Sequence, residues 1–376
     1  MVPNLRFSNL DKLMKVRLGD ICTITGGYAF DSHKMTQKGD YQIIKMGNLY
    51  NGIFDLSRNS SFINAPTKKE LEYLIQENDI LITLTGTTNK KDYGYTVQME
   101  QPKNLLLNQR CALIRASKVN EKYLFYLLNS NDFLKQFYAS STGDTGNQTN
   151  VSINDMLDFK VYISNENDQS KISNILNALD KKILTQIKII NRLYSQIKYI
   201  KGQILNMTTI TETKPLGQLC NISTGKRDAN EMKSNGSYKF FTCSKDDYCI
   251  DTYSFDGEAL IISGNGELGL IKYYNGKFDA YQRTYVLQNF KCHPKYLMYV
   301  LQNKLPKKIE KEKNVGAMPY IVLKTLTSIN IDILNMHDQI KIVNILNKFE
   351  EKLENDRMLL ELFEKEKSFL LKNLFV

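Results

Sequence analysis

The sequence DQSKISNILN at residues 168–177 returns as DQIKIVNILN at residues 338–347, and this repeat is the strongest indication of the fold. Eight of the ten positions are identical, at a constant offset of 170 residues. The match continues without a gap toward the end of the chain, which indicates an internal duplication rather than chance similarity. The fold therefore has to contain two copies of one unit.

Each copy carries a heptad pattern of apolar residues. Steps of four and three residues separate the apolar positions, which is the spacing of a coiled-coil seam. The pattern predicts two long helices of about 57 Å each at ~1.5 Å per residue, with Asp168 and Asp338 as the expected N-caps. The seam residues are Ile172, Leu176, Leu179, Ile183, Ile190, Leu193, Ile197, Ile200 and Ile204 in the first copy, and Ile342, Leu346, Phe349, Leu353, Leu360, Phe363, Leu370 and Leu374 in the second.

One polar residue interrupts each seam near its midpoint, Gln186 in the first copy and Asp356 at the same place in the second. Antiparallel pairing of the two helices would put these side chains in adjoining layers. A buried polar layer fixes the register of a helix pair at some cost in stability. The alternative is that the helices belong to an unrelated bundle, but seams of this length favour pairing with each other.

The composition limits the class of protein. A chain of 376 residues is long enough for two or three domains. The net charge of +10 favours polyanionic partners, although biased codon usage also enriches lysine. The six cysteines form no Cys-x-x-Cys pair, so we expect reduced thiols and no zinc. Because the chain shows neither a signal-peptide core nor an apolar run of about eighteen residues, we expect a soluble, cytoplasmic protein with no membrane contact.

The segments that precede the two helices also match. VRLGDIC at residues 16–22 returns as KPLGQLC at 214–220, and KYLFYLL at 122–128 returns as KYLMYVL at 295–301. Between these landmarks the two halves diverge. The first half predicts strands at 80–85, 93–97 and 111–114 and a helix at 121–138; the second predicts strands at 259–263, 270–274 and 284–287 and a helix from 294 to 303.

These patterns predict an α+β fold with a pseudo-two-fold internal repeat. Two mixed α/β domains, at residues 1–166 and 209–336, are joined by two long antiparallel coiled-coil helices at residues 167–208 and 337–376.

The predicted strand ends carry side chains that suit contacts with nucleic acid. GTTNKK at residues 86–91 and SGNG at 263–266 follow equivalent strands, and Asn, Gln, Lys and Arg commonly contact phosphates and base edges. A solvated turn is the alternative. NQR at 108–110 and YQR at 281–283 keep Gln-Arg in divergent surroundings, which indicates a shared phosphate contact or a structural salt bridge. We favour the salt bridge, because residues that specify different DNA sequences should differ.

Further polar segments add candidates. The glycine-rich loop at 141–150 corresponds in position to residues 311–316, and either a functional loop or a flexible linker fits it. The candidate DNA-binding residues are Thr85, Gly86, Thr87, Thr88, Asn89, Lys90, Lys91, Gln109, Arg110, Asn147, Gln148, Lys226, Arg227, Ser263, Asn265, Tyr281, Gln282, Arg283, Lys313 and Asn314.

Motifs for catalysis or cofactor binding are missing. GNGELG at residues 264–269 matches a dinucleotide-binding turn, but the strand-like IKYYNG that follows predicts a hairpin instead. The chain has no phosphate-binding loop with Gly-Lys, no His-Glu-x-x-His and no methyltransferase Asn-Pro-Pro-Tyr. We expect no catalytic residue and no metal site, although scattered acidic residues leave a nuclease centre open.

The order of these motifs resembles a known family. LGDIC at 18–22 and LGQLC at 216–220, each opening a variable region that ends in Asp-Gln-x-Lys-Ile and a long helix, are similar to specificity subunits of type I restriction-modification systems. The resemblance implies a subunit without catalysis, in which each globular half is a target recognition domain for one part of a split, asymmetric site in double-stranded DNA. It implies that the helix pair sets the spacer between the half-sites.

The resemblance also implies partners. Two methyltransferase subunits and the restriction subunits would assemble on the chain, and S-adenosylmethionine, ATP and Mg²⁺ would belong to those partners, with no cofactor bound by this chain. Two other functions stay open: a coiled-coil assembly protein whose halves bind proteins, and an enzyme with a fused nuclease or methyltransferase site, which the missing motifs disfavour.

Overall fold

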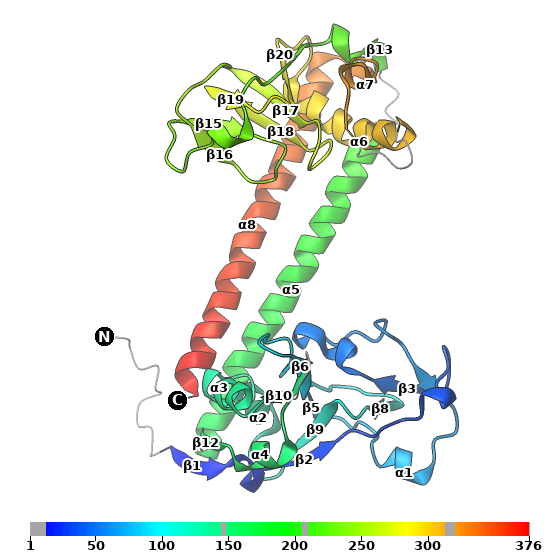
Figure 1. The fold of residues 1–376 in the computed structure, drawn as a ribbon, viewed down its shortest axis with the longest axis vertical. Helices are drawn as coiled ribbons and strands as arrows, with labels where there is room; N and C mark the ends of the chain where they lie inside the picture. The colour runs from blue at the N-terminus through cyan, green and yellow to red at the C-terminus, as the bar shows by residue number, and fades with distance from the viewer. Residues whose placement is uncertain (1–12, 144–147, 205–209, 313–319, 376) are drawn as a thin grey trace. The chain divides into compact units, whose positions relative to one another are not determined.

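The computed structural model describes residues 13–143, 148–204, 210–312 and 320–375, which form two compact units (Figure 1). Unit 1 comprises residues 1–186 and 359–376, and unit 2 comprises residues 187–358. Each unit contains one globular α/β part and half of each long helix. None of the helices in the described ranges is long and apolar enough to cross a membrane.

Unit 1 contains four small sheets and short helices. β2 (Cys22–Gly26), β9 (Cys111–Ala116), β5 (Ile80–Thr83) and β7 (Thr96–Gln98) form a four-stranded sheet in that order. The other sheets are β4 (Phe62–Ile63), β3 (Tyr41–Ile44) and β8 (Leu105–Leu107); β10 (Thr142–Gly143), β11 (Gln148–Asn150) and β6 (Thr85–Thr87); and β1 (Met14–Arg17) with β12 (Lys160–Ile163). The α-helices before the long helix are α1 (Lys68–Leu71), α2 (Glu121–Leu127), α3 (Asn131–Ala139) and α4 (Ile153–Asp158).

Unit 2 repeats this topology. β14 (Asn221–Thr224), β20 (Thr284–Gln288), β17 (Glu258–Ser263) and β18 (Ile271–Asn275) form the four-stranded sheet. β16 (Tyr248–Ile250), β15 (Tyr238–Phe241) and β19 (Phe278–Ala280) form the three-stranded sheet, β13 (Ile210–Pro215) pairs with β21 (Asn330–Leu334), and the helices are α6 (Pro294–Glu312) and α7 (Leu323–Thr327).

The strand registers of the two four-stranded sheets show which residues of unit 1 correspond to which residues of unit 2. Thr83 pairs with Cys111 in unit 1, as Ser263 pairs with Thr284 in unit 2. The sheet of β4, β3 and β8 and the sheet of β16, β15 and β19 each contain one parallel pair, β3 with β8 and β15 with β19. The sheet of β10, β11 and β6 has no counterpart in the part of unit 2 that the structure describes. The predicted internal repeat is therefore confirmed at the level of strand pairing.

The hairpin predicted for residues 264–269 is confirmed, because β17 pairs antiparallel with β18 on either side of this segment. The strand predicted at 80–85 is wrong at its end. Leu84 leaves the sheet: its amide donates to the Arg110 carbonyl (3.0 Å) and its carbonyl accepts from the Val151 amide (3.0 Å). Thr85–Thr87 then pairs with β11 in a different sheet. Of the strand predicted at 93–97, only its end lies in β7, which begins at Thr96.

The single helix predicted at 121–138 is two helices. α2 ends at Leu127, and Ser130 caps α3 by accepting a hydrogen bond from the Phe133 amide (3.3 Å). A serine side chain that accepts a hydrogen bond from the amide three residues later is a typical N-cap, so a new helix begins at this point. The apolar spacing survives the break because both helices pack on the same core, which includes Tyr123, Leu127 and Phe133.

The long helices are α5 (Glu166–Ile204) and α8 (Met336–Leu374), with 39 residues each. The N-caps predicted at Asp168 and Asp338 are wrong by three residues. Asn165 accepts from the Asp168 amide (2.9 Å) and Asn335 accepts from the Asp338 amide (2.9 Å), so the asparagines are the caps. Both aspartates lie in the first turn, where a negative charge is favourable for the helix dipole.

The two long helices are antiparallel within each unit. In unit 1, Leu176 near the start of α5 shares a core with Phe375 after the end of α8, and Asp180 forms an ion pair with Lys367 (2.6 Å). In unit 2, Glu350 of α8 forms an ion pair with Lys201 near the end of α5 (3.0 Å). The antiparallel coiled coil predicted from the seams is confirmed. Gln186 and Asp356 are buried, as the polar-layer hypothesis requires, but their role in fixing register stays a prediction.

The ion pairs belong to clusters that occur once in each unit. The Tyr126 hydroxyl donates to Asp180 (2.8 Å), and the Tyr299 hydroxyl donates to Glu350 (2.9 Å), which is the equivalent acid 170 residues later. The pKa values of the Tyr126 and Tyr299 hydroxyls are raised, mainly by burial and to a lesser extent by the neighbouring Asp180 and Glu350 carboxylates. Both hydroxyls therefore stay protonated and can donate. Each globular part is thereby joined through one acid to both long helices.

The repeated Asp-Gln motif has a structural reason. Gln169 is buried, accepts from the Asn120 amide (2.9 Å) and donates to the Ser164 carbonyl (2.8 Å). Gln339 is also buried; it accepts from the His293 amide (2.8 Å) and donates to the Leu334 carbonyl (2.7 Å). Each glutamine therefore fastens the start of a long helix to the loop before the preceding domain helix.

Replacing Gln169 or Gln339 with alanine should lower the free energy of unfolding by about 1–3 kcal/mol, because each change leaves a buried carbonyl and a partly buried amide hydrogen without their partner. Urea unfolding followed by circular dichroism measures the change. Gln196→Ala, at an exposed position of α5, is the matched control and should have little effect. Equal midpoints for the three variants would contradict this role of the motif.

Candidate nucleic-acid interface

Unit 1 has a polar surface pocket of about 660 Å³ beside the point where Leu84 leaves the main sheet. Gln109 and Arg110, in the turn between β8 and β9, form one wall, and Thr85 of β6 lies beside them. β10 and β11 complete the lining with Thr142, Gly143, Gln148, Thr149 and Asn150. The Thr85 hydroxyl donates to the Asn150 side-chain oxygen (3.0 Å), which joins the two edges.

Unit 2 has a pocket of about 390 Å³ in the corresponding place. Gln282 and Arg283, in the turn between β19 and β20, form its wall, and Asn265 lies in the loop after β17. Thr224, Gly264, Tyr285, Tyr320 and Ile321 complete the lining. The Ile321 amide donates to the Gly264 carbonyl (2.9 Å), as the Val151 amide does to Leu84 in unit 1.

These hydrogen bonds define four equivalent positions in the two pockets. Because Val151 corresponds to Ile321 and Leu84 to Gly264, Asn150 corresponds to Tyr320 and Thr85 to Asn265. The remaining two positions hold Gln109 with Gln282 and Arg110 with Arg283. Two positions are therefore identical between the units and two differ.

The salt bridge that we favoured for the Gln-Arg pairs is not formed among the described residues. Arg110 and Arg283 are exposed, and neither has a carboxylate partner there. Their backbones have a shared role, since the Arg110 carbonyl accepts from Leu84 and the Arg283 carbonyl accepts from Gly264 (3.0 Å each). The main chain shapes the pocket, and the guanidinium groups stay available to a ligand.

One glycine in each unit sets the position of the Gln-Arg turn. A Cβ atom at Gly27 would lie 2.1 Å from the Asn108 carbonyl oxygen, and one at Gly225 would lie 2.0 Å from the Ala280 carbonyl oxygen. The two glycine amides donate to equivalent carbonyls, those of Cys111 (2.9 Å) and Thr284 (3.0 Å). Only glycine permits this approach of two backbone segments.

Gly27→Ala and Gly225→Ala should each destabilise their own unit by about 1–3 kcal/mol, because the obstacle is backbone that cannot rotate away. Thermal unfolding measures the loss. Gly202→Ala is the control, since a Cβ atom there meets nothing within 4 Å. Wild-type stability in Gly225→Ala would show that the two segments can separate freely.

The segment at 86–91 is mostly occupied by internal contacts. The Thr87 hydroxyl and amide both donate to Asp92 (2.6 and 2.7 Å), and these hydrogen bonds lower the pKa of the Asp92 carboxyl. Gly86 packs on Tyr93, because a Cβ atom would lie 2.2 Å from that ring. The Lys91 ammonium lies 5.2 Å from the Tyr138 ring centre. Thr88, Asn89 and Lys90 complete the turn outside the pocket lining, and only Thr85 of this candidate group lines it.

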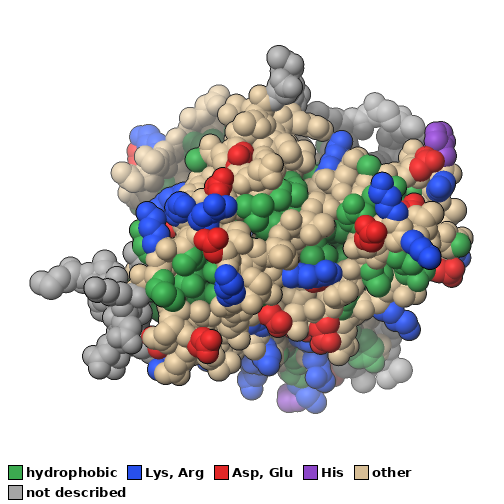
Figure 2. Space-filling view, turned by 90° about the horizontal axis from the view of Figure 1, so that it is seen from below, with side chains coloured by type: hydrophobic (Ala, Val, Ile, Leu, Met, Phe, Trp, Pro, Cys, Tyr) green, Lys and Arg blue, Asp and Glu red, His purple; other side chains and the backbone are tan. Residues whose placement is uncertain are grey.

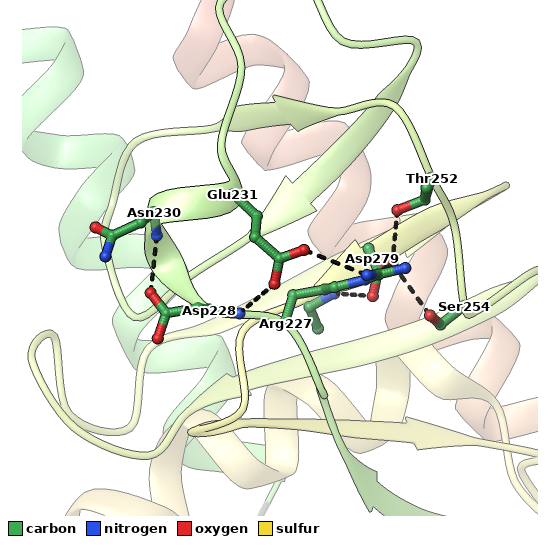
Figure 3. A network of polar contacts seen from close by, with 8 residues as sticks. Arg227, Asp228, Asn230, Glu231, Thr252, Ser254 and Asp279 are labelled. Carbon is green, nitrogen blue, oxygen red and sulfur yellow. Dashed lines mark hydrogen bonds and ion pairs between the residues drawn. The ribbon is translucent and has the colours of Figure 1, made fainter.

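Arg227 belongs to a polar network around the buried Asp279 rather than to an open basic surface (Figure 3). Its Nε lies 3.1 Å from Asp279, which is fully buried, and its Nη1 lies 3.2 Å from Glu231. The hydroxyls of Ser254 (3.1 Å) and Thr252 (3.4 Å) also donate to Asp279. The hydrogen bond to Asp279 raises the pKa of the Arg227 guanidinium.

This network supports the Gln-Arg turn of unit 2. The Arg227 carbonyl accepts from the Gln282 amide (3.0 Å), and Arg227 bridges to Tyr281 in the parallel sense. In unit 1 the Tyr28 carbonyl accepts from Gln109 in the same way, and Leu106 takes the place of Asp279 in the parallel strand pair. One unit therefore supports its pocket with an ion pair, and the other with an aromatic and an aliphatic side chain.

The other candidates are placed as follows. Gln148 lines the unit 1 pocket. Ser263 is buried and Lys226 is exposed outside the pocket lining. Tyr281 pairs through its backbone. Asn147, Lys313 and Asn314 lie outside the described residues.

Sequence reasoning missed Asn150 and Tyr320 as pocket residues. Asn150 was part of a loop singled out by its composition, but no single-residue signal distinguished it. Tyr320 precedes Ile321 as Asn150 precedes Val151. In the sequence, the signal shared by the two positions is a polar or aromatic residue followed by a β-branched residue, and the structure shows that both β-branched residues are buried. The structure identifies both through their hydrogen-bonded neighbours.

The charges on one face of the molecule and the buried thiols of the described residues give no sign of a further site. Figure 2 shows a face on which lysine and arginine side chains are interspersed with aspartate and glutamate, so the positive charge there is dispersed. Burial raises the pKa of the Cys22, Cys111 and Cys220 thiols to about 12 and that of Cys292 to about 11, so these thiols stay protonated. Within the described ranges, no group of three or more His, Cys, Asp or Glu residues could hold a metal ion.

Two α/β units with matching strand orders, each containing part of an antiparallel pair of long helices and each carrying a pocket at the corresponding place, define a tandem-repeat protein with two related surface pockets. A family model described as "Type I restriction modification DNA specificity domain" matches residues 11–194 and again residues 211–362. The chain belongs to this family.

Individual relatives agree with the family. The specificity subunit of the type I restriction enzyme EcoDI from Escherichia coli is 35% identical over 150 residues, which covers 40% of this chain and 33% of that protein. The match thus spans about a third of that relative's length. The crystal structure of a type I restriction-modification S subunit from M. genitalium has a TM-score of 0.68 at 18% identity and covers 100% of this chain and 99% of that one.

A second structure, from work on complex assembly and conformational transition of the type I R-M system, has a TM-score of 0.55 at 14% identity and covers 96% and 97% of the two chains. At these identities the structural likeness establishes the fold.

Proposed function

We propose that this chain is the sequence-specific DNA-binding specificity subunit of a type I restriction-modification complex. The target recognition domains, at residues 1–166 and 209–336, each read one part of a bipartite, asymmetric site in double-stranded DNA. The pair of equivalent pockets carries the proposal: both present a Gln-Arg pair at the same place, while the residues around it differ. Pockets that share the Gln-Arg pair but differ in the surrounding residues are suited to two half-sites of different base sequence.

The chemistry of the pocket residues supports nucleic acid as the ligand. The linings combine guanidinium, amide and hydroxyl groups, which are the side chains that contact phosphates and base edges. The long helices supply the spacer in this proposal, since each has 39 residues. A catalytic role lies with partner subunits in this proposal, and S-adenosylmethionine, ATP and Mg²⁺ are theirs.

The helix surfaces support docking of two copies of one partner, which we assign to methyltransferase subunits. Ile175, Leu359 and Phe369 are exposed in unit 1, and the residues 170 positions away, Ile345, Ile189 and Tyr199, are exposed in unit 2. We assign these side chains, which occupy equivalent positions of the repeat, to the contacts with the two partner copies. The assembly would direct adenine methylation and, with restriction subunits, cleavage in the cytoplasm.

Selection from a random duplex library by the full-length chain with its methyltransferase partner tests the proposal. We expect enrichment of one asymmetric sequence with two defined parts and an undefined spacer of fixed length, and affinity that falls steeply with salt. Modified adenines in the host genome should lie in the same sequence. Retention of DNA without any sequence preference would refute the proposal and favour the protein-binding alternative.

A further inference from the structure

We infer that Arg110 and Arg283 are twin contacts to the DNA sugar-phosphate backbone, whereas the divergent pairs Thr85 with Asn150 and Asn265 with Tyr320 select the bases. This inference rests on the proposed function and assigns separate roles to residues of the same pocket. It reverses the structural role that the sequence favoured for the Gln-Arg pairs.

Most arginines of the described residues form ion pairs with carboxylates, but Arg110 and Arg283 do not. Of the eight arginines within the described ranges, Arg17, Arg58, Arg115, Arg227 and Arg357 form ion pairs with carboxylates. Arg110, Arg192 and Arg283 do not. Two of these three occupy the same position in equivalent pockets and are exposed. A planar guanidinium group without a protein carboxylate suits bidentate binding of a phosphate.

The Gln-Arg pair is identical in the two units. Two half-sites of an asymmetric target differ in base sequence but have the same phosphate backbone. Side chains that contact the backbone can therefore be the same in both units, and side chains that read bases have to differ. Gln109 and Arg110 recur as Gln282 and Arg283, so they fit the backbone role.

The differing positions fit base reading. Asn265 carries an amide, which can form two hydrogen bonds with adenine in the major groove. Its counterpart Thr85 offers one hydroxyl, which already donates to Asn150. At the last position Tyr320, 70% exposed, stands where unit 1 has Asn150. The two pockets therefore present different hydrogen-bonding groups beside the same arginine.

Library selection and salt-dependent binding, both with the full-length chain, separate the two roles. Arg110→Ala and Arg283→Ala should each raise the Kd for selected and unrelated duplexes alike by about tenfold. Each should reduce the slope of log K against log salt by about 0.9, the value for one phosphate contact. The selected sequence should stay unchanged. Arg110→Lys and Arg283→Lys keep the charge and should restore most of the slope.

Asn265→Ala and Asn150→Ala should do the reverse, changing the bases selected in one half-site each and leaving the salt slope near the wild-type value. Arg192→Ala, which removes an unpaired arginine outside the pockets, should change neither quantity. Because all these side chains except Asn265 are exposed, thermal unfolding should confirm intact variants.

Two failures can be told apart. If the wild-type chain selects no bipartite sequence, the proposed function fails. If the wild-type chain selects such a sequence but Arg110→Ala or Arg283→Ala loses a base preference in its half-site, the arginines read bases and the inference is overturned. An unchanged Kd in both arginine variants would overturn it as well.

Discussion

Replacing Asp279 with alanine is expected to lower the free energy of unfolding of unit 2 by about 1–3 kcal/mol, the range for leaving a buried hydrogen-bonding group without its partner. Asp279 is fully buried and accepts from Arg227, Thr252 and Ser254 and from the Ala280 amide (3.0 Å). All four donors lose their acceptor at once. Urea unfolding of the full chain, with probes in each unit, measures the effect.

The two units supply a matched control for this change. Unit 1 has Leu106 where unit 2 has Asp279, and Tyr28 where unit 2 has Arg227. The double substitution Asp279→Leu with Arg227→Tyr transfers this apolar arrangement to unit 2 and should recover a large part of the loss, because replacing both partners of a hydrogen-bonded pair by apolar groups can be nearly neutral. If Asp279→Ala unfolds at the wild-type urea concentration, the network does not support unit 2.

Adding one heptad to both long helices is expected to lengthen the undefined spacer of the selected DNA sequence by about 3 base pairs. Seven residues add about 10 Å of helix at ~1.5 Å per residue, and a turn of DNA of ~10 base pairs measures ~34 Å. Duplicating residues 187–193 of α5 and 357–363 of α8 keeps both seams in phase, because these segments are equivalent in the repeat. Affinity for the original sequence should fall toward the non-specific level, since only one half-site can then be engaged.

Selection from the random duplex library reads the spacer directly. Duplicating the heptad in α5 alone is the control: it should lower the thermal unfolding midpoint without producing a defined longer spacer, because the seams no longer match. A double insertion that folds and still selects the original spacing would mean that the helices do not set the distance between half-sites.

The repeat, the two long helices and their antiparallel pairing could all be predicted from the amino-acid sequence. Heptad spacing is a local signal that persists over many turns, so Ile172 and Leu176 identify a seam without knowledge of their partners. Helix ends depend on single hydrogen bonds, and this is why Asn165 and Asn335 replaced the predicted caps. The hairpin after Ser263 was also predictable, because the residues on both sides have strand patterns and glycines lie between them.

Which candidate residues share a site follows from the folded structure and could not be predicted from the sequence. Arg110 and Asn150 are 40 residues apart in sequence, and the crossing of Leu84 between two sheets brings them to one pocket. Lys226 and Arg227 are adjacent and equally basic in the sequence, yet one is exposed and the other pairs with buried Asp279. Availability of a charged side chain depends on whether a distant segment supplies an opposite charge. Local sequence patterns carry no information about that partner, and the fold supplies it.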